Sequence, residues 1–155
     1  MTGVQTCALP ISKGHPNQLE PGKRPYHTII PAMATNKDNN QLIGPFGVMG
    51  GFMQPQGHMQ VAINLFEEHL DPQTSLDKPR FCILPENAAN EVAIEEGFDF
   101  RTLSELSDMG HAVKPVSGMK RAIFGRGQII IRNNEGVLSA GSDPRADGCA
   151  LPLIF

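Results

Sequence analysis

The feature of this sequence best suited to chemistry is a glycine pair, Gly50-Gly51, between an apolar segment and a helical pattern. Because glycine has no side chain, the two backbone N–H groups are unobstructed and could both donate to an anion or a developing oxyanion. A tight turn that requires positive φ would select the same residues without any chemistry. The pattern alone favours that structural interpretation.

The remaining polar residues form no known catalytic or metal-binding motif. The histidines are scattered and the HExxH, HxH and CxxC motifs are absent, so neither a metal site nor a cofactor is predicted. The sequence also lacks a GxSxG nucleophile elbow and a GK[ST] phosphate loop. The pairs Glu67-Glu68 and Glu95-Glu96 are expected on solvated faces. The segment Ser142-Asp143-Pro144-Arg145 predicts a loop with a local ion pair.

The elements around the glycine pair must position it. Apolar residues in 26–35 and 41–49 predict two strands, and the turn-forming run NKDNN between them predicts a hairpin. A helix over 57–70 is expected to cover one side of that hairpin. Its apolar stripe would consist of Met59, Ala62, Ile63, Phe66 and Leu70. Asp71-Pro72 then predicts the N-cap and first residue of a short helix that ends near Pro79.

Strand and helix signals alternate in the second half of the chain. The predicted elements are a strand over 92–94, a helix from Asp99 or Thr102 to Met109, strands over 112–116 and 122–124, and a hairpin of 128–132 and 137–140. Strands and helices grouped in this way predict an α+β fold or a layered sandwich.

Composition excludes several classes of function. The formal net charge of −3 is unlike the basic surface of a nucleic-acid-binding protein, so no nucleic acid is expected as a partner. The apolar runs are too short to cross a bilayer, so no membrane partner is expected either. Three cysteines, Cys7, Cys82 and Cys149, cannot form a disulfide framework. With 155 residues, the chain is one domain or a piece of one.

Residues 1–12 differ from the rest of the chain. They carry no charge, lack the basic region of a signal peptide, and resemble the translation of a sequencing adapter. We therefore treat 1–12 as a non-native segment and 13–155 as the natural part, with its true N-terminus upstream. The chain is expected to be a fragment, and its cellular compartment is left open.

Five segments in order resemble the C-terminal, small-subunit part of the gamma-glutamyltranspeptidase family. They are Lys23-Arg24-Pro25, Pro31-Ala32-Met33, Gly50-Gly51, Pro79-Arg80-Phe81 and Ser142-Asp143-Pro144-Arg145. The segment GVMGGFMQPQGHMQV resembles the bacterial branch of the family and related acylases. The resemblance implies an N-terminal-nucleophile hydrolase with an αββα sandwich, of which this chain would form a part.

The resemblance also implies roles for particular residues. Family members cleave their own precursor, and the new N-terminal Thr attacks a γ-glutamyl amide to form an acyl-enzyme. By position, Gly50 and Gly51 match the pair whose amides form the oxyanion hole, which reverses the interpretation from pattern alone. His27 and Thr28 match a Ser pair that contacts the α-carboxylate of the substrate. The segments around Arg80 and Asp143 carry over as structural.

The chain departs from the family where the nucleophile should be. The Thr-x-His motif is absent, as are the Asn and acidic residues that hold the α-amino group of the substrate. The expected partners are therefore the missing N-terminal part of the precursor and a γ-glutamyl or other acyl-amide substrate, and the fragment alone should be inactive. The alternative is a stand-alone, non-catalytic α/β module whose Gly-Gly loop binds a small anion.

Overall fold

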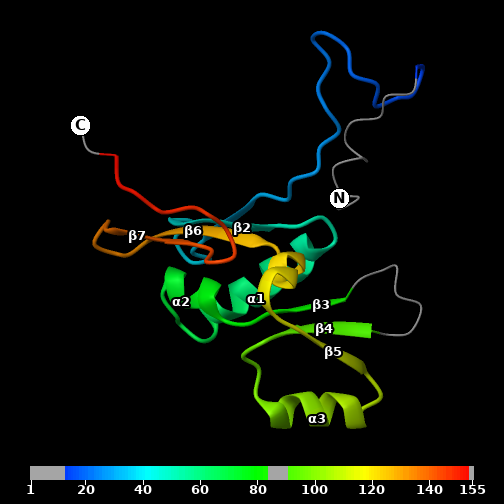
Figure 1. Ribbon diagram of the computed structural model, residues 1–155. Coiled ribbons are helices and arrows are strands. Elements are labelled where there is room, and N and C mark those ends of the chain that lie inside the picture. The colour runs from blue at the N-terminus through cyan, green and yellow to red at the C-terminus, as the bar shows by residue number, and fades with distance from the viewer. Residues whose placement is uncertain (1–12, 84–90, 154–155) are drawn as a thin grey trace.

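The computed structural model describes residues 13–83 and 91–153, which form two β-sheets and three α-helices (Figure 1). Sheet A has the strand order β1-β2-β6-β7, with neighbouring strands antiparallel. Sheet B has the order β3-β4-β5, in which β3 and β4 are antiparallel and β4 and β5 are parallel. The expected adapter-derived segment 1–12 lies outside the described residues.

The elements follow one another along the chain with these bounds: β1 Ala32–Thr35, β2 Leu42–Met49, α1 Met53–Phe66, α2 Pro72–Asp77, β3 Phe81–Ile83, β4 Glu91–Glu95, α3 Phe100–Asp108, β5 Ala112–Val116, a 3-10 helix η1 Gly118–Phe124, β6 Arg126–Arg132 and β7 Leu138–Ser142. Helices α1 and α2 lie on one face of sheet A, while sheet B and α3 lie farther from it (Figure 1).

Both predicted hairpins are confirmed. In the first, the Asn36 amide donates to the Gln41 carbonyl at 2.8 Å and closes the turn between β1 and β2. In the second, the side chain of Asn133 accepts from the amides of Glu135 and Val137 and closes the turn between β6 and β7. The first strand was predicted to begin at residue 26 but begins at Ala32, because the Thr28 carbonyl and the Ile30 amide bond to the side chain of Gln54 and not to a neighbouring strand.

Helix α1 covers sheet A, and Phe66 of the predicted stripe packs against the core as expected, but Met59 and Ile63 do not. The buried residues are Met53, Gln54, Gly57, Val61 and Leu65, whereas Met59 and Ile63 are each 43% exposed. The cause is Gly57, where an added Cβ would lie 2.7 Å from Val48 Cγ1. The helix therefore packs on the sheet along the row through Gly57, and Met59 and Ile63 face away from the sheet.

The start of α1 also differs from the prediction. It begins at Met53 and not at residue 57, because Pro55 falls in the first turn, where a proline costs no hydrogen bond. Helix α2 begins as predicted: the carboxylate of Asp71 accepts from the amides of Gln73 and Thr74, both at 3.0 Å. Hydrogen bonds from Thr74 also lower the pKa of Asp71.

The predicted strands β4 and β5 and the helix from Asp99 are confirmed, and Asp99 is the N-cap of α3. The predicted strand over 122–124 is wrong, since these residues belong to the 3-10 helix η1. Gly118 and Gly125 enclose this helix with φ of 59° and 72°, and neither value fits a strand. The short strand β3 was not predicted.

Two apolar clusters form the core. One joins sheet A to the helices and contains Val48, Val61, Leu65, Leu76 and Ile129. The other lies between the start of α1 and sheet B and contains Met53, Cys82, Ala93, Val116 and Phe124. Helix α1 contributes to both clusters and so joins the two sheets.

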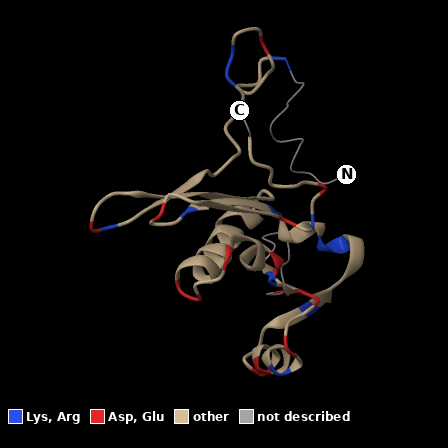
Figure 2. Ribbon diagram, turned by 90° about the vertical axis from the view of Figure 1, so that its left-hand side faces the viewer, with Lys and Arg blue, Asp and Glu red and all other residues tan. Residues whose placement is uncertain are grey.

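The other face of sheet A is uncovered within the described residues. One row of this face runs across the strands through Met33, Pro45, Ile130 and Ala140, all of them exposed. Met33 is 63% exposed and Ile130 is 45% exposed, although both are apolar. Viewed on edge, the sheet has helices below it and only the two terminal segments above it (Figure 2). A bare sheet face fits a chain that forms only a part of the αββα sandwich implied by the resemblance.

Glutamine side chains from the helices close two sheet edges. Each of three glutamines donates its amide N–H to the carbonyl of one strand residue and accepts from the N–H of the same residue. The pairs are Gln56 with Ile83 at 3.0 and 2.8 Å, Gln60 with Phe81 at 3.1 and 2.9 Å, and Gln73 with Ser142 at 3.0 and 3.1 Å. These amides replace a neighbouring strand along β3 and at the end of β7.

Candidate active site

The Gly50-Gly51 turn connects the end of β2 to the start of α1. Its φ values are 141° at Gly50 and 61° at Gly51, and both lie in the region that favours glycine. The two carbonyls accept from the amides of Met53 and Gln54, each at 3.1 Å, so they face the helix. Neither glycine N–H donates to another described residue. The turn therefore offers two successive backbone donors that the fold does not use.

A second glycine supports the turn from behind. Gly125 follows η1 with a φ of 72°, and an added Cβ there would lie 2.2 Å from the carbonyl oxygen of Met49. A Cβ added to Gly50 would lie 3.2 Å from the Cα of Gly125. The two backbones are thus in close contact, which limits the freedom of the turn.

The other predicted site residues, His27 and Thr28, are exposed and belong to the extended segment before β1. The carbonyl of Thr28 accepts from Nε2 of Gln54 at 2.7 Å. Since the amide of Gln54 donates to Gly51, the structure brings Thr28 to the same end of α1 as the glycine pair.

Two residues that the sequence analysis missed hold this arrangement together. Gln54 is buried and also accepts from the Ile30 amide at 2.9 Å, while His58 Nε2 lies 2.7 Å from the Ile30 carbonyl. Their spacing of four residues, which places both on one helical face, was available in the sequence. Because Gln54 and His58 are both polar, a search for apolar residues at helical spacing does not find them.

Behind the turn, a buried ion network joins the two sheets. Its carboxylates are Asp143 and Glu95, and its guanidinium groups are Arg80 and Arg145. Arg80 donates to Asp143 at 2.7 Å, and Arg145 donates to both oxygens of Glu95 at 2.7 and 2.5 Å. The predicted local pair of Asp143 and Arg145 is present at 3.0 Å.

The expectation that Glu95 faces solvent is wrong. The residue is 2% exposed because it ends β4 beneath the two arginines, and Arg121 also donates to it at 2.7 Å. Burial alone would raise the pKa of Glu95, but the hydrogen bonds from Arg145 and Arg121 outweigh it and lower the pKa. Its neighbour Glu96 is exposed, as expected.

The network reaches the support of the turn. Arg80 donates through Nη1 to the carbonyl of Phe124 at 3.1 Å, and the amide of Gly127 donates to Asp143 at 2.7 Å. These contacts hold the residues on both sides of Gly125. Burial alone would raise the pKa of Asp143. The charge of Arg80 and the hydrogen bonds from the Arg145 and Gly127 amides outweigh burial, so the pKa is lowered. The network thus holds the segments on both sides of Gly125 in place.

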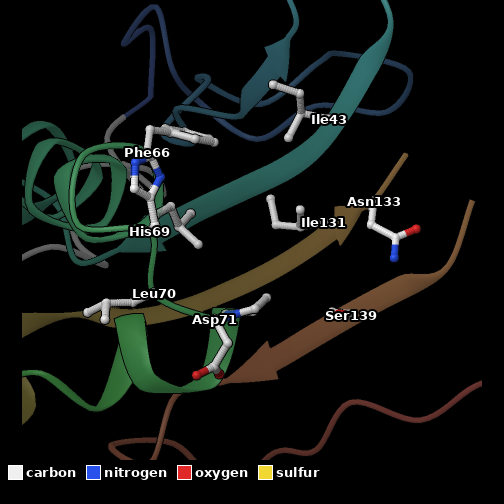
Figure 3. A pocket seen from close by; sticks show the side chains of 10 residues that line it. Ile43, Phe66, His69, Leu70, Asp71, Ile131, Asn133 and Ser139 are labelled. Carbon is white, nitrogen blue, oxygen red and sulfur yellow. The ribbon is translucent and has the colours of Figure 1, made fainter. Parts of the chain in front are cut away.

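A hollow lies at the opposite end of α1. It has a volume of about 410 Å³ and lies between the last turn of the helix, the start of α2 and strands β2, β6 and β7 (Figure 3). Its walls are mainly apolar, with Ile43, Phe66 and Ile131, and its polar members include His69 and Asp71. The carboxylate of Asp71 already caps α2, so it is not free to act in this hollow.

Among the described residues, no three His, Cys, Asp or Glu side chains are grouped closely enough to hold a metal ion. In the same part of the chain, no helix has the length and apolar character needed to cross a membrane.

Comparisons with known proteins agree on one family. The model of the gamma-glutamyltranspeptidase family matches residues 2–153. The glutathione hydrolase-like YwrD proenzyme of Bacillus subtilis (strain 168) is 31% identical over 146 residues, which cover 92% of this chain and 27% of that protein. The oxamate amidohydrolase proenzyme of Klebsiella pneumoniae is 28% identical, with coverage of 93% and 27%. The chain thus spans about a quarter of the length of these relatives.

Solved structures similar to this chain support the fold. Cephalosporin acylase from Bacillus halodurans is 47% identical with a TM-score of 0.71, and the match covers 90% of this chain and 25% of that one. A gamma-glutamyltranspeptidase from Pseudomonas nitroreducens, complexed with L-DON, is 22% identical with a TM-score of 0.68 and coverage of 91% and 70%. The second match supports the fold alone.

Proposed function

This chain belongs to the gamma-glutamyltranspeptidase family, with the α+β fold of an N-terminal-nucleophile hydrolase, and we propose that it is the oxyanion-binding part of an enzyme that transfers or hydrolyses γ-glutamyl or related acyl groups. The observation that carries the proposal is the pair of unused amides at Gly50 and Gly51. A turn fixed from behind by Gly125 is preorganised to receive developing negative charge.

In the proposed mechanism, a Thr supplied by the missing part of the precursor attacks the acyl carbonyl. Its α-amine takes the hydroxyl proton, and the carbonyl oxygen becomes an oxyanion that accepts from Gly50 and Gly51. Collapse of the tetrahedral intermediate expels the amine, which leaves with the proton, and an ester acyl-enzyme remains. Water or an acceptor amine then resolves this ester and restores the free Thr.

We propose that His27 and Thr28 contact the carboxylate of the acyl group. The Thr hydroxyl can donate one hydrogen bond and the His ring another, so the pair differs from two serines in reach and in charge. The relatives are named for different acyl substrates, including glutathione, oxamate and cephalosporins. The class of substrate proposed here is accordingly an acyl amide that carries a carboxylate, with γ-glutamyl as the first candidate.

The missing part of the precursor is the proposed partner. It would supply the nucleophile and cover the exposed row through Met33 and Ile130. We also propose that 1–12 are adapter-derived and that the natural gene continues upstream of residue 13. The genomic sequence tests this, because an in-frame Thr-x-His motif is expected a few dozen codons earlier, whereas a start codon beside Lys13 would favour the anion-binding module.

Substitution of Gly51 in the complete processed enzyme tests the oxyanion assignment. Gly51→Pro removes one amide donor and should lower kcat about 10²–10³-fold with a smaller change in KM. Gly51→Ala is the control: it also introduces strain at φ 61°, although less than proline, whose ring fixes φ near −65°, and it keeps the N–H, so it should retain far more activity. A folded Gly51→Pro enzyme with unchanged kcat would refute the assignment. The isolated chain should show no turnover of a γ-glutamyl anilide.

A further inference from the structure

The segment proposed to bind the acyl carboxylate has little support of its own. Every residue from 21 to 31 is exposed, and β1 begins only at Ala32. His27 and Thr28 therefore cannot keep a fixed position through burial. Whatever fixes them relative to the oxyanion turn must act through the backbone.

Gln54 makes that connection with both ends of its side chain. Nε2 donates to the carbonyl of Thr28 at 2.7 Å, and Oε1 accepts from the amide of Ile30 at 2.9 Å. The side chain is buried, and its own backbone N–H donates to Gly51 at 3.1 Å. One residue therefore bonds to both halves of the proposed site.

His58, one helical turn later, holds the same segment. Its Nε2 lies 2.7 Å from the carbonyl of Ile30, and its Nδ1 lies 2.5 Å from the carbonyl of Gln54. Each ring nitrogen thus lies within hydrogen-bonding distance of a backbone carbonyl oxygen. The ring of Phe46 lies beside it, with ring centroids 6.0 Å apart. His58 thus binds the segment and Gln54 together.

We propose that Gln54 and His58 are positioning residues that hold the 27–30 segment at a fixed distance from the Gly50-Gly51 turn, and so set the affinity and selectivity for the carboxylate-bearing acyl group. The inference rests on the proposed function, because it requires that His27 and Thr28 contact the carboxylate of the acyl group. It goes beyond that function by assigning specificity to two residues that do not touch the substrate.

The test compares Gln54→Leu with Gln60→Leu in the complete processed enzyme. Both glutamines lie on α1 and bond twice to a backbone, but Gln60 holds Phe81 of β3, away from the proposed site. Loss of two hydrogen bonds to the segment should raise KM for a γ-glutamyl anilide about tenfold in Gln54→Leu, with kcat changed less than about twofold. A donor that lacks the carboxylate should show no such rise, and Gln60→Leu should leave KM unchanged.

Two further measurements separate the positioning from the function. Amide hydrogen exchange at Ile30 should be faster in Gln54→Leu than in Gln60→Leu, and His58→Phe should shift exchange and KM in the same direction. Unchanged exchange at Ile30 would overturn the inference and leave the oxyanion assignment standing. Faster exchange with unchanged KM would overturn the role of His27 and Thr28 in binding. Equal effects of the two leucine variants would show a structural role only.

Discussion

The buried carboxylate of Asp143 allows the sharpest prediction about stability. All four groups that contact it are donors: Nη2 of Arg80, Nη1 of Arg145, and the amides of Gly127 and Arg145, at distances from 2.7 to 3.0 Å. In Asp143→Asn, the new NH₂ must therefore face a donor in either orientation of the amide. The substitution keeps the shape of the side chain and removes its charge.

The expected cost follows from burial. The side chains of Arg80 and Asp143 are 2% and 0% exposed, so the arginine keeps its charge without its closest counter-ion and without access to water. Breaking a buried ion pair from one side typically costs about 3–5 kcal/mol, of which an unsatisfied donor alone accounts for about 1–3 kcal/mol. We expect Asp143→Asn to lose about 3 kcal/mol of unfolding free energy.

The assay is urea unfolding of the chain at low micromolar concentration, followed by far-UV circular dichroism. Glu105→Gln is the control, since it makes the same chemical change in the exposed pair of Glu105 with Arg101 and should cost at most about 0.5 kcal/mol. A loss in Asp143→Asn below 1 kcal/mol, or equal to that of the control, would refute the view that the network holds the two sheets together.

Three more predictions concern acid, packing and association. Because the folded-state pKa values of Asp143 and Glu95 are lowered, unfolding free energy should be constant from neutral pH down to about pH 5 and fall below about pH 4 in a pH series of urea titrations. Gly57→Ala should cost about 1–3 kcal/mol by overpacking against Val48, and Val48→Ala should cancel part of that loss in the double variant. Ile130→Lys, on the uncovered face, should reduce the self-association seen by analytical ultracentrifugation, and an unchanged sedimentation profile would contradict the assigned exposure.

The elements that could be predicted from sequence are those whose signals are local. Turn-forming residues at 36–40 and 133–136 and the Asp71 cap each fix a conformation through neighbours a few residues away. The apolar face of α1 could not be predicted in this way. A single glycine, Gly57, decides which row of the helix approaches Val48, and hydropathy treats that residue as neutral.

The candidate site shows the same limit. The glycine pair is visible as a local pattern, and the resemblance to a family gave it a role. The support behind it depends on residues distant in sequence, such as Arg80 with Phe124 and Gln54 with Thr28. A glutamate next to another glutamate resembles a solvated pair until Arg145, fifty residues away, is placed beside Glu95. Contacts of this kind arise from topology, which single-residue properties do not encode.

The glutamines that close the sheet edges restrict how another polypeptide could bind this chain. Along β3, Gln56 and Gln60 already occupy the hydrogen-bonding groups of Phe81 and Ile83, so a foreign strand cannot extend sheet B there without displacing them. The broad side of sheet A has no such protection. A partner is therefore expected to pack face to face on that side of sheet A, as the two sheets of a β-sandwich do. The glutamine side chains of α1 disfavour the addition of a strand beside β3.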